Sequence, residues 1–163
     1  MIPCYFARKC KAMDITFKYN DIINRCEMLS AFEAKDKFDA NGESRFLEIH
    51  INDVDKQLIQ QYIIQARGIL EERIGRMIDS VDDIAATTTD GPGFKWTINP
   101  NTRWKSNSTF ISHVTEAIVA YAMACWLKGR LDERVAFYET LHTNTLAMAV
   151  KNIFTKQAPS YVL

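Results

Sequence analysis

The chain has 163 residues, a length that fits one domain whose hydrophobic core needs no disulfide or metal to hold it. Twenty Lys and Arg side chains balance twenty Asp and Glu side chains, so the formal net charge is zero. This balance argues against a protein whose main task is to grip nucleic acid, except through a local basic patch. No apolar run near the N-terminus would act as a signal-peptide core or a membrane span, so we expect the protein to be made and kept in a cytosol, with no membrane contact.

The residue types give no catalytic or metal-binding signature. The cysteines lack paired CxxC spacing and a histidine at ligand distance, so we expect reduced thiols that act as small apolar side chains at Cys4, Cys10, Cys26 and Cys125. His50, His113 and His142 lie far apart in the sequence, and the acidic residues around position 82 do not follow the loop pattern of a calcium site. We therefore predict no catalytic residues, no metal and no cofactor, and we expect a protein that is not an enzyme.

The first fifty residues predict only short elements. The alternating stretch DITFKY, within residues 1–19, fits a short strand or an extended arm, and we assign an arm. A short first helix is predicted from the apolar spacing of Ile22, Ile23, Cys26, Leu29 and either Ala31 or Phe32. An Asn-Gly turn signal at 41–42 marks a polar loop or hairpin tip, and the alternation in RFLEIHI predicts a short strand at 45–51.

The clearest helix covers residues 53–78. Its apolar side chains recur every three or four residues and form one stripe that must pack against a neighbouring element: Val54, Leu58, Ile59, Tyr62, Ile63, Ala66, Ile69, Leu70, Ile74 and Met77. Gly68 and Gly75 each cost about 1 kcal/mol relative to alanine inside a helix. We therefore expect a closely approaching neighbour helix at these glycines or, at Gly75, the end of the helix.

Residues 79–108 break the helical period. Turn residues surround the strand-forming stretch FKWTI, which predicts a β-hairpin or a protruding loop. Aromatic and cationic residues alternate here as they do in single-stranded nucleic-acid binders: Phe94, Lys95, Trp96, Arg103, Trp104 and Lys105. The other interpretation is a hairpin whose aromatics cover the core or a partner subunit. We favour it because the net charge is zero and aromatic residues commonly anchor interfaces.

Two helices, at about 110–128 and 131–154, are predicted to form a helical hairpin that turns at Gly129. The first is apolar almost all round, since Ala120, Met123 and Ala124 lie outside its main apolar stripe. A helix of this kind is buried on more than one side. Because few other elements are long enough to cover it, we expect another subunit as its second cover, with Trp126 anchoring the end where the chain turns.

Two stretches carry a family resemblance. In YIIQARGILEERIGR, at 62–76, five positions match a helix pattern: Tyr62, Ala66, Glu71, Gly75 and Arg76. EAIVAYAMACWL, at 116–127, is an alanine-rich helix that turns directly into a Tyr-containing amphipathic helix. This order resembles the head-to-tail connector and head-completion (neck ring, adaptor) proteins of tailed bacteriophages and their prophages. The resemblance covers most of residues 53–155 and is a pattern of helix lengths and residue positions, not an invariant motif. Residues 1–50 and 79–108 depart from it.

The resemblance implies a non-enzymatic structural subunit of the virion. Copies would form a homo-oligomeric ring, commonly of twelve, in the neck beneath the portal protein, joined to tail and neck proteins and extending the channel for packaged DNA. We expect the following residues at subunit or partner interfaces: Phe94, Trp96, Trp104, Ala120, Met123, Ala124, Tyr161 and Leu163. We expect Lys95, Arg103 and Lys105 near the passing DNA, in contact with it non-specifically.

The expected fold is mainly α, a small bundle of three main helices and one short helix with a β-hairpin or extended-loop excursion and extended termini. The domain assignments are an N-terminal arm at 1–19, a helical connector-like domain at 20–155 that includes the 79–108 excursion, and a tail at 156–163. The alternative function is a small helical nucleic-acid-binding regulatory protein. An enzyme is the weakest alternative, because it needs convergent titratable groups that the sequence does not indicate.

Overall fold

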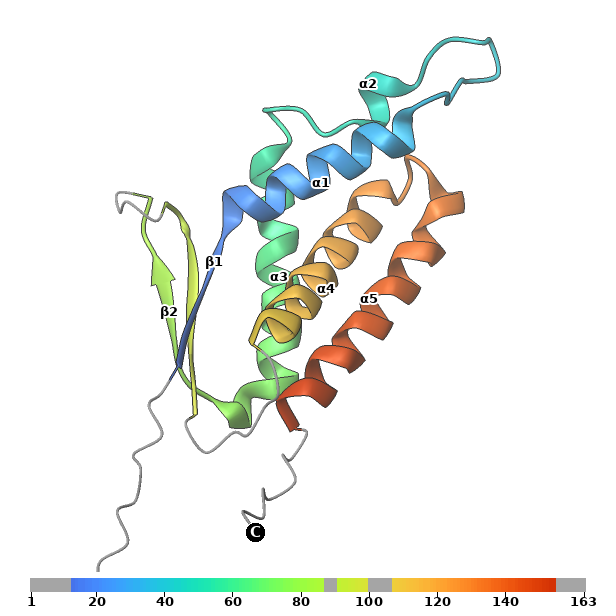
Figure 1. Ribbon diagram of the computed structural model, residues 1–163. Helices are drawn as coiled ribbons and strands as arrows, with labels where there is room; N and C mark the ends of the chain where they lie inside the picture. The colour runs from blue at the N-terminus through green and yellow to red at the C-terminus, as the bar shows by residue number, and fades with distance from the viewer. Residues whose placement is uncertain (1–12, 87–90, 100–106, 155–163) are drawn as a thin grey trace, which may run out of the picture.

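Helices dominate the structure, and a small sheet packs at one side of them (Figure 1). The computed structural model describes residues 13–86, 91–99 and 107–154. These residues form a three-stranded antiparallel sheet, the one-turn helix α2 (Phe46–Ile49) and four long helices: α1 (Tyr19–Ala34), α3 (Lys56–Ile74), α4 (Asn107–Leu127) and α5 (Asp132–Phe154). The expected bundle of three main helices, one short helix and a β-hairpin is therefore wrong. The first helix is longer than its apolar spacing indicated, and the sheet has a third strand.

The third strand comes from the residues assigned to an N-terminal arm. β1 (Met13–Lys18) pairs antiparallel with β3 (Gly93–Ile98), which places Ile15 opposite Trp96 and Phe17 opposite Phe94. β3 also pairs with β2 (Ile78–Ile84), so the strand order is β1-β3-β2. Alternate residues of β1 are buried, and this burial holds the segment in the sheet. The arm assignment is thus corrected for residues 13–18, and residues 1–12 lie outside the described part of the chain.

The segment between α1 and α3 contains a helical turn where a strand was predicted. In α2, Ile49 is buried, whereas Phe46 and Leu47 are exposed, so the alternation in RFLEIHI does not reflect a sheet face. The Arg45 guanidinium bonds the Glu48 carboxylate at 2.8 Å, an i,i+3 pair that fits a helix. The predicted turn at 41–42 is present: Gly42 has a φ of +80°, and Phe38 and Ser44 bridge across it.

The helix α3 begins later and ends earlier than the predicted range 53–78, and it ends just before Gly75, in line with one of the two roles expected for that glycine. Asn52 and Asp55 form a turn before it, since the Asn52 side-chain oxygen accepts the Val54 amide at 3.0 Å and the Asp55 carboxylate accepts the Asn52 amide at 3.1 Å. Gly75 opens a 3₁₀ turn, η1 (Gly75–Met77), that leads directly into β2. The buried stripe matches the predicted one at Ile59, Ile63, Ala66, Leu70 and Ile74.

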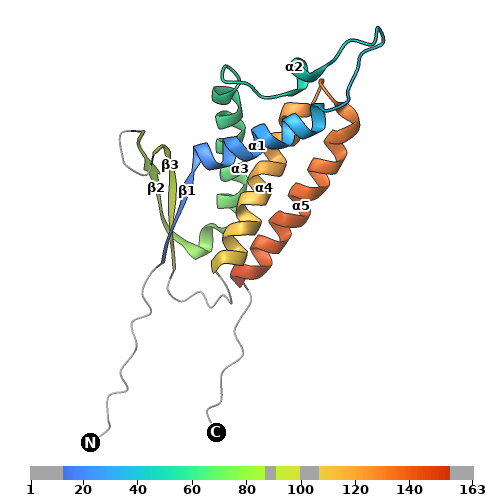
Figure 2. The same ribbon diagram turned by 45° about the horizontal axis from the view of Figure 1, so that its top comes forward.

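The α4–α5 hairpin has the predicted boundaries within a few residues. Gly129 adopts a φ of +79° at the turn, a conformation that glycine adopts without the steric cost that a side chain brings. Its amide donates to the Asp132 carboxylate at 2.7 Å, and Asp132 is the first residue of α5. Figure 2 shows α3, α4 and α5 side by side, with α1 crossing them.

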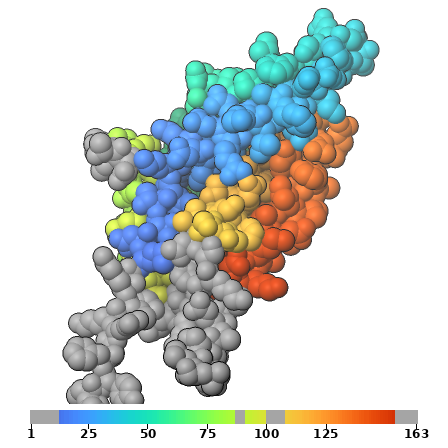
Figure 3. Space-filling model, in the orientation of Figure 1, coloured from blue at the N-terminus to red at the C-terminus, as the bar shows by residue number. Residues whose placement is uncertain are grey.

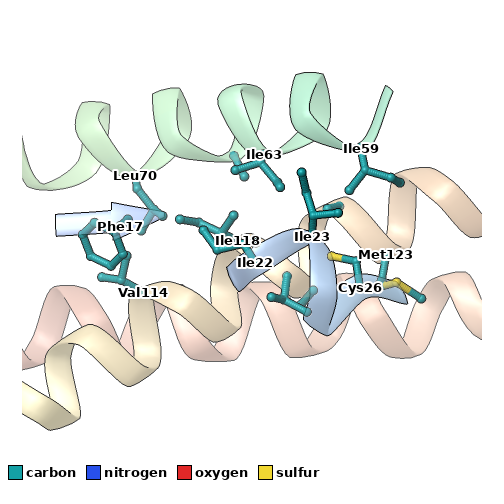
Figure 4. Close-up of a cluster of buried hydrophobic side chains, with 14 of the residues drawn as sticks. Phe17, Ile22, Ile23, Cys26, Ile59, Ile63, Leu70, Val114, Ile118 and Met123 are labelled. Carbon is teal, nitrogen blue, oxygen red and sulfur yellow. The ribbon is translucent and has the colours of Figure 1, made fainter. Parts of the chain in front are cut away.

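One continuous core joins the helices and the sheet. Side chains from β1, α1, α3 and α4 meet in it, as Figure 4 shows for Phe17, Ile22, Ile23, Cys26, Ile59, Ile63, Leu70, Val114, Ile118 and Met123. α4 lies between α3 and α5 and is crossed by α1 (Figure 2), so its circumference is covered largely within one chain. Residues 108–127 of α4 have the length and apolar composition to cross a membrane, but 61% of this stretch is buried inside the protein, as in a core helix.

Candidate interaction surface

The aromatic residues of β3 that were expected at an interface belong to the core. Phe94 and Trp96 are both fully buried, on the face of the sheet that packs against the helices. Phe17 of β1 stacks on Phe94 with ring centroids 4.8 Å apart, and it meets Trp96 edge-on at 5.2 Å. These two residues are therefore not available to a partner, and their interface assignment is corrected.

A polar network on α3 fixes this buried face. The indole N–H of Trp96 donates to the Glu71 carboxylate at 2.8 Å, and the same carboxylate oxygen accepts from Arg67 at 2.6 Å. The Arg67 guanidinium also pairs with Asp83 of β2 and lies 4.8 Å from the centroid of the Phe94 ring. The polar end of the tryptophan thus has its partner inside the chain, which is the condition for burying it at low cost.

Lys95, expected near DNA, lies on the opposite face of β3 between two carboxylates. Its ammonium group is 3.8 Å from Asp14 and 3.6 Å from Asp82, one on each neighbouring strand. Two flanking carboxylates offset its charge, so this part of the sheet is not a basic patch. Arg103, Trp104, Lys105, Tyr161 and Leu163 lie outside the residues that the structure describes.

The small residues of α4 are also core residues. Ala120 and Met123 are fully buried and Ala124 is 7% exposed, all within one chain. The second cover that was expected from another subunit is supplied by α1, which is long enough to cross α4. The interface assignment of these three residues is corrected: small residues let α4 lie close to helices of its own chain.

Exposed apolar side chains gather instead where α1 lies beside α5. The two helices border a groove of about 350 Å³, called here the α1/α5 groove, lined by Arg25, Met28, Leu29, Glu116, Phe137, Tyr138 and Leu141. Met28 is 73% exposed and Phe137 is 50% exposed, whereas Leu29 and Leu141 are half-buried. At one edge the Arg25 guanidinium pairs with Glu116 of α4. Figure 3 shows α1 and α5 on one face of the molecule.

The apolar surface continues beyond the groove. Phe32 lies one helical turn after Met28 on α1 and is 71% exposed. Met148, half-exposed, lies seven residues after Leu141 and so shares its face of α5. Isolated exposed apolar residues are ordinary on a protein surface, but several together on two adjoining helices are typical of an interaction site.

A buried carboxylate holds α1 and α5 together beside the groove. Glu33 of α1 is 6% exposed and accepts two hydrogen bonds from the Arg134 guanidinium, at 2.8 and 2.9 Å, and one from the Tyr138 hydroxyl at 2.9 Å. Burial, and after it the hydrogen bond to Glu33, raises the pKa of Tyr138. Arg134 also lies 4.5 Å from the ring centroid of Phe137, so this network helps to position a ring that lines the groove.

The most reactive residue types meet in a second hollow, between α4 and α5. It has a volume of about 390 Å³, and Tyr121, Cys125, Lys128, Glu139 and His142 contribute to its lining. Burial raises the pKa of the Cys125 thiol, which keeps it protonated and a weak nucleophile. The His142 ring bonds the Ala117 carbonyl oxygen through Nδ1 at 2.9 Å. Among the described residues, no three His, Cys, Asp or Glu side chains form a group that could hold a metal ion.

The other two histidines also have partners within the chain. His50 lies 3.4 Å from the Ser30 hydroxyl through Nδ1, and its ring packs against Phe46 with centroids 5.0 Å apart. His113 of α4 is bonded through Nδ1 to the side-chain amide of Asn152 at 2.8 Å. These contacts join separate elements, so the geometry assigns both rings to packing.

The apolar spacing of α1 did not reveal the groove, because it assigned either Ala31 or Phe32 to the buried stripe of that helix. A signal was present: Met28 and Phe32 are four residues apart and share a face, whereas the buried residues Ile22, Cys26 and Ser30 follow another face. Two separate apolar stripes on one amphipathic helix indicate a core face and a second contact face.

Comparisons with models of known protein families, with curated proteins and with solved structures found no match to this chain.

Proposed function

We propose that this chain is a structural subunit of the neck of a tailed bacteriophage, where copies form a ring that joins the portal to the tail around the DNA channel. The observation that carries the proposal is the α1/α5 groove with its neighbour Phe32. Apolar side chains lie exposed together there on two adjoining helices, as expected of a subunit that assembles with others. The resemblance of residues 62–76 and 116–127 to connector proteins supports the assignment to a phage neck.

The positions that carry this resemblance have structural roles in α3. Ala66 is buried, Glu71 accepts the Trp96 indole N–H, and Gly75 begins the turn from helix to strand. The pattern thus supports a long helix that passes into a hairpin and then into a final helical pair. This arrangement is compatible with the connector proposal, which rests on the sequence resemblance and on the exposed apolar side chains of the α1/α5 groove.

Sedimentation velocity and negative-stain electron microscopy test the proposal. We expect a monomer or small oligomer in isolation and rings when the portal protein of the same phage is added. Phe32→Glu should weaken assembly, since a charge would be buried in the contact. Ile64→Glu, at a half-exposed apolar residue of α3, is the matched control and should assemble like the parent. A chain that stays monomeric at every concentration and does not associate with the portal would overturn the proposal.

The alternative, a nucleic-acid-binding regulator, receives no support from the described part of the hairpin. Its exposed residues include Asp79, Asp82 and Asp83, and Lys95 lies between two carboxylates. A regulator should bind labelled DNA or RNA at low protein concentration, with an affinity that falls steeply as salt rises. We expect no such binding from the isolated chain.

A further inference from the structure

The α1/α5 groove has the properties of a peptide-binding site. Its lining is aliphatic and aromatic, from Met28, Leu29, Phe137 and Leu141, together with the buried Tyr138. The Arg25–Glu116 ion pair lies at its edge, where solvent reaches it. A volume of about 350 Å³ is at the lower end of the range for ligand sites, about 300–1,000 Å³, and suits a few side chains rather than a folded element.

The groove is held open by its own framework. Glu33 ties α1 to α5 through Arg134 and Tyr138, and Lys37 and Glu133 pair across the same end of the two helices. Because the walls keep their spacing without a ligand, a bound segment does not have to order them, and binding costs less conformational entropy.

A segment of suitable chemistry follows α5 in the sequence. Residues 155–163, TKQAPSYVL, contain three consecutive apolar residues, Tyr161, Val162 and Leu163, and carry no acidic residue. Pro159 restricts the backbone just before them, which reduces the entropy lost when such a segment binds in an extended form. A short apolar segment of this composition loses less free energy on binding to a preformed groove than to one that it must first order.

The groove of the same copy is out of reach for most of this segment. Leu141 lies thirteen residues before Phe154, so at 1.5 Å per residue it is about 20 Å back along α5, and Phe137 is about 26 Å back. A reversal uses about three residues, and an extended chain covers about 3.3–3.6 Å per residue. Tyr161 would therefore advance only about 14 Å back along its own helix, short of both residues, and Leu163 would advance about 20 Å, to the level of Leu141 but short of Phe137.

We propose that the α1/α5 groove binds residues 159–163 of a neighbouring copy, so that each subunit is latched to the next by an exchanged segment that follows α5. The inference rests on the proposed function, because it requires that copies of this chain assemble. It adds the surface and the segment that make the contact. Head-to-tail exchange of this kind is a heterologous contact, and it closes into a ring when the rotation between copies is suitable.

Photo-crosslinking in the full chain tests this. Tyr161 is replaced by benzoylphenylalanine, and protein grown on heavy isotopes is mixed with light protein under the conditions where sedimentation shows assembly. After irradiation, mass spectrometry should find Tyr161-site crosslinks to peptides of α1 and α5 that contain Met28 or Phe137. About half of these crosslinked pairs should combine one heavy and one light chain if subunits mix freely.

Variants locate the contact. Met28→Glu and, independently, Phe137→Glu should lower the crosslink yield about tenfold or more, because each places a charge against an apolar ligand. Both residues are at least half exposed, so the fold should tolerate the changes, and circular dichroism checks this. Ile64→Glu, on α3 and outside the groove, should leave the yield within about twofold.

The outcomes separate this inference from the proposed function. Assembly with crosslinks that map elsewhere, or only within one chain, overturns the latch and leaves the ring proposal standing. The latch is also overturned if Met28→Glu and Ile64→Glu lower the crosslink yield equally. Absence of assembly, with no crosslinks between heavy and light chains, counts against both.

Discussion

The indole N–H of Trp126 donates a 2.7 Å hydrogen bond to the backbone carbonyl oxygen of Ile49, where α2 ends. Both residues are buried, and the Arg130 guanidinium lies 3.7 Å from the centroid of the indole ring. One side chain therefore fastens the turn between α4 and α5 to the segment between α1 and α3. These two parts of the chain are 77 residues apart in sequence.

Trp126→Ala should lower the free energy of unfolding by about 3–5 kcal/mol, the usual cost of truncating a large buried aromatic residue. Trp126→Phe is the matched variant. It keeps most of the apolar contact but leaves the Ile49 carbonyl oxygen without its indole donor, so we expect a smaller loss of about 1–3 kcal/mol. Urea unfolding monitored by circular dichroism measures both. A urea unfolding curve of Trp126→Ala that overlays the curve of the parent would show that Trp126 does not hold these two segments together.

Glu33 should stabilise the fold through its two partners on α5. Glu33→Ala leaves the Arg134 guanidinium and the Tyr138 hydroxyl without their acceptor, and we expect a loss of about 2 kcal/mol. A larger value is not expected because Arg134 is about one-third exposed, and water screens part of the interaction. In a double-mutant cycle with Arg134→Leu, the coupling energy should be favourable, about 1 kcal/mol or more. Additive losses would mean that the pair contributes through packing alone.

Stability should fall in the alkaline range. Burial raises the pKa of the Cys26 thiol from 9.0 to about 12. In the unfolded chain the thiol loses its proton near pH 9, whereas the folded protein keeps it, so raising the pH between about 9 and 12 favours unfolding. One such group contributes a slope of at most about 1.4 kcal/mol per pH unit. Tyr138, whose pKa is also raised, acts in the same direction.

Cys26→Ala isolates the contribution of the thiol. The variant should be less stable than the parent at pH 8, because it loses buried sulfur contacts, but its free energy of unfolding should fall less steeply between pH 9 and 11. Urea unfolding at several pH values measures the two slopes. Equal slopes would show that the Cys26 thiol does not ionise differently in the folded and unfolded states.

Elements with a strong local signal could be predicted from the sequence. The stripe from Ile59 to Ile74 marks the buried face of α3, and Gly129 marks the turn before α5. The pairing of Met13 with Ile98 could not be predicted, because alternation shows that a strand can form but not which distant strand it joins. α2 was missed for a related reason: over seven residues, a short apolar run does not distinguish a strand from a single helical turn.

The candidate surface was harder to predict than the fold. Phe94, Trp96 and Ala120 have the residue types found at interfaces, but a core and an interface select the same side chains. The packing of the sheet beside α3 and the crossing of α4 by α1 decide that these residues face their own chain. The exposed pair Met28 and Phe32 differs from the buried residues of α1 only in its face of the helix, so a correct assignment needs the precise helix phase.

Two glycines should respond to the same substitution with opposite signs. A Cβ atom at Gly93 would lie 2.1 Å from the backbone carbonyl oxygen of Phe17, far inside contact distance, because β1 and β3 approach closely there. Since the obstacle is backbone, it cannot move aside without breaking the pairing, and Gly93→Ala should destabilise the protein by about 3 kcal/mol or more.

Gly68 was expected to admit a neighbouring helix, but nothing lies within 4 Å of a Cβ atom built there. Gly68→Ala should therefore stabilise α3 by about 0.5–1 kcal/mol, because alanine loses less backbone entropy on folding. Urea midpoints of the two variants, measured beside the parent, check both signs. A destabilised Gly68→Ala would indicate a contact at α3 with another chain, and a tolerated Gly93→Ala would contradict the close approach of the two strands.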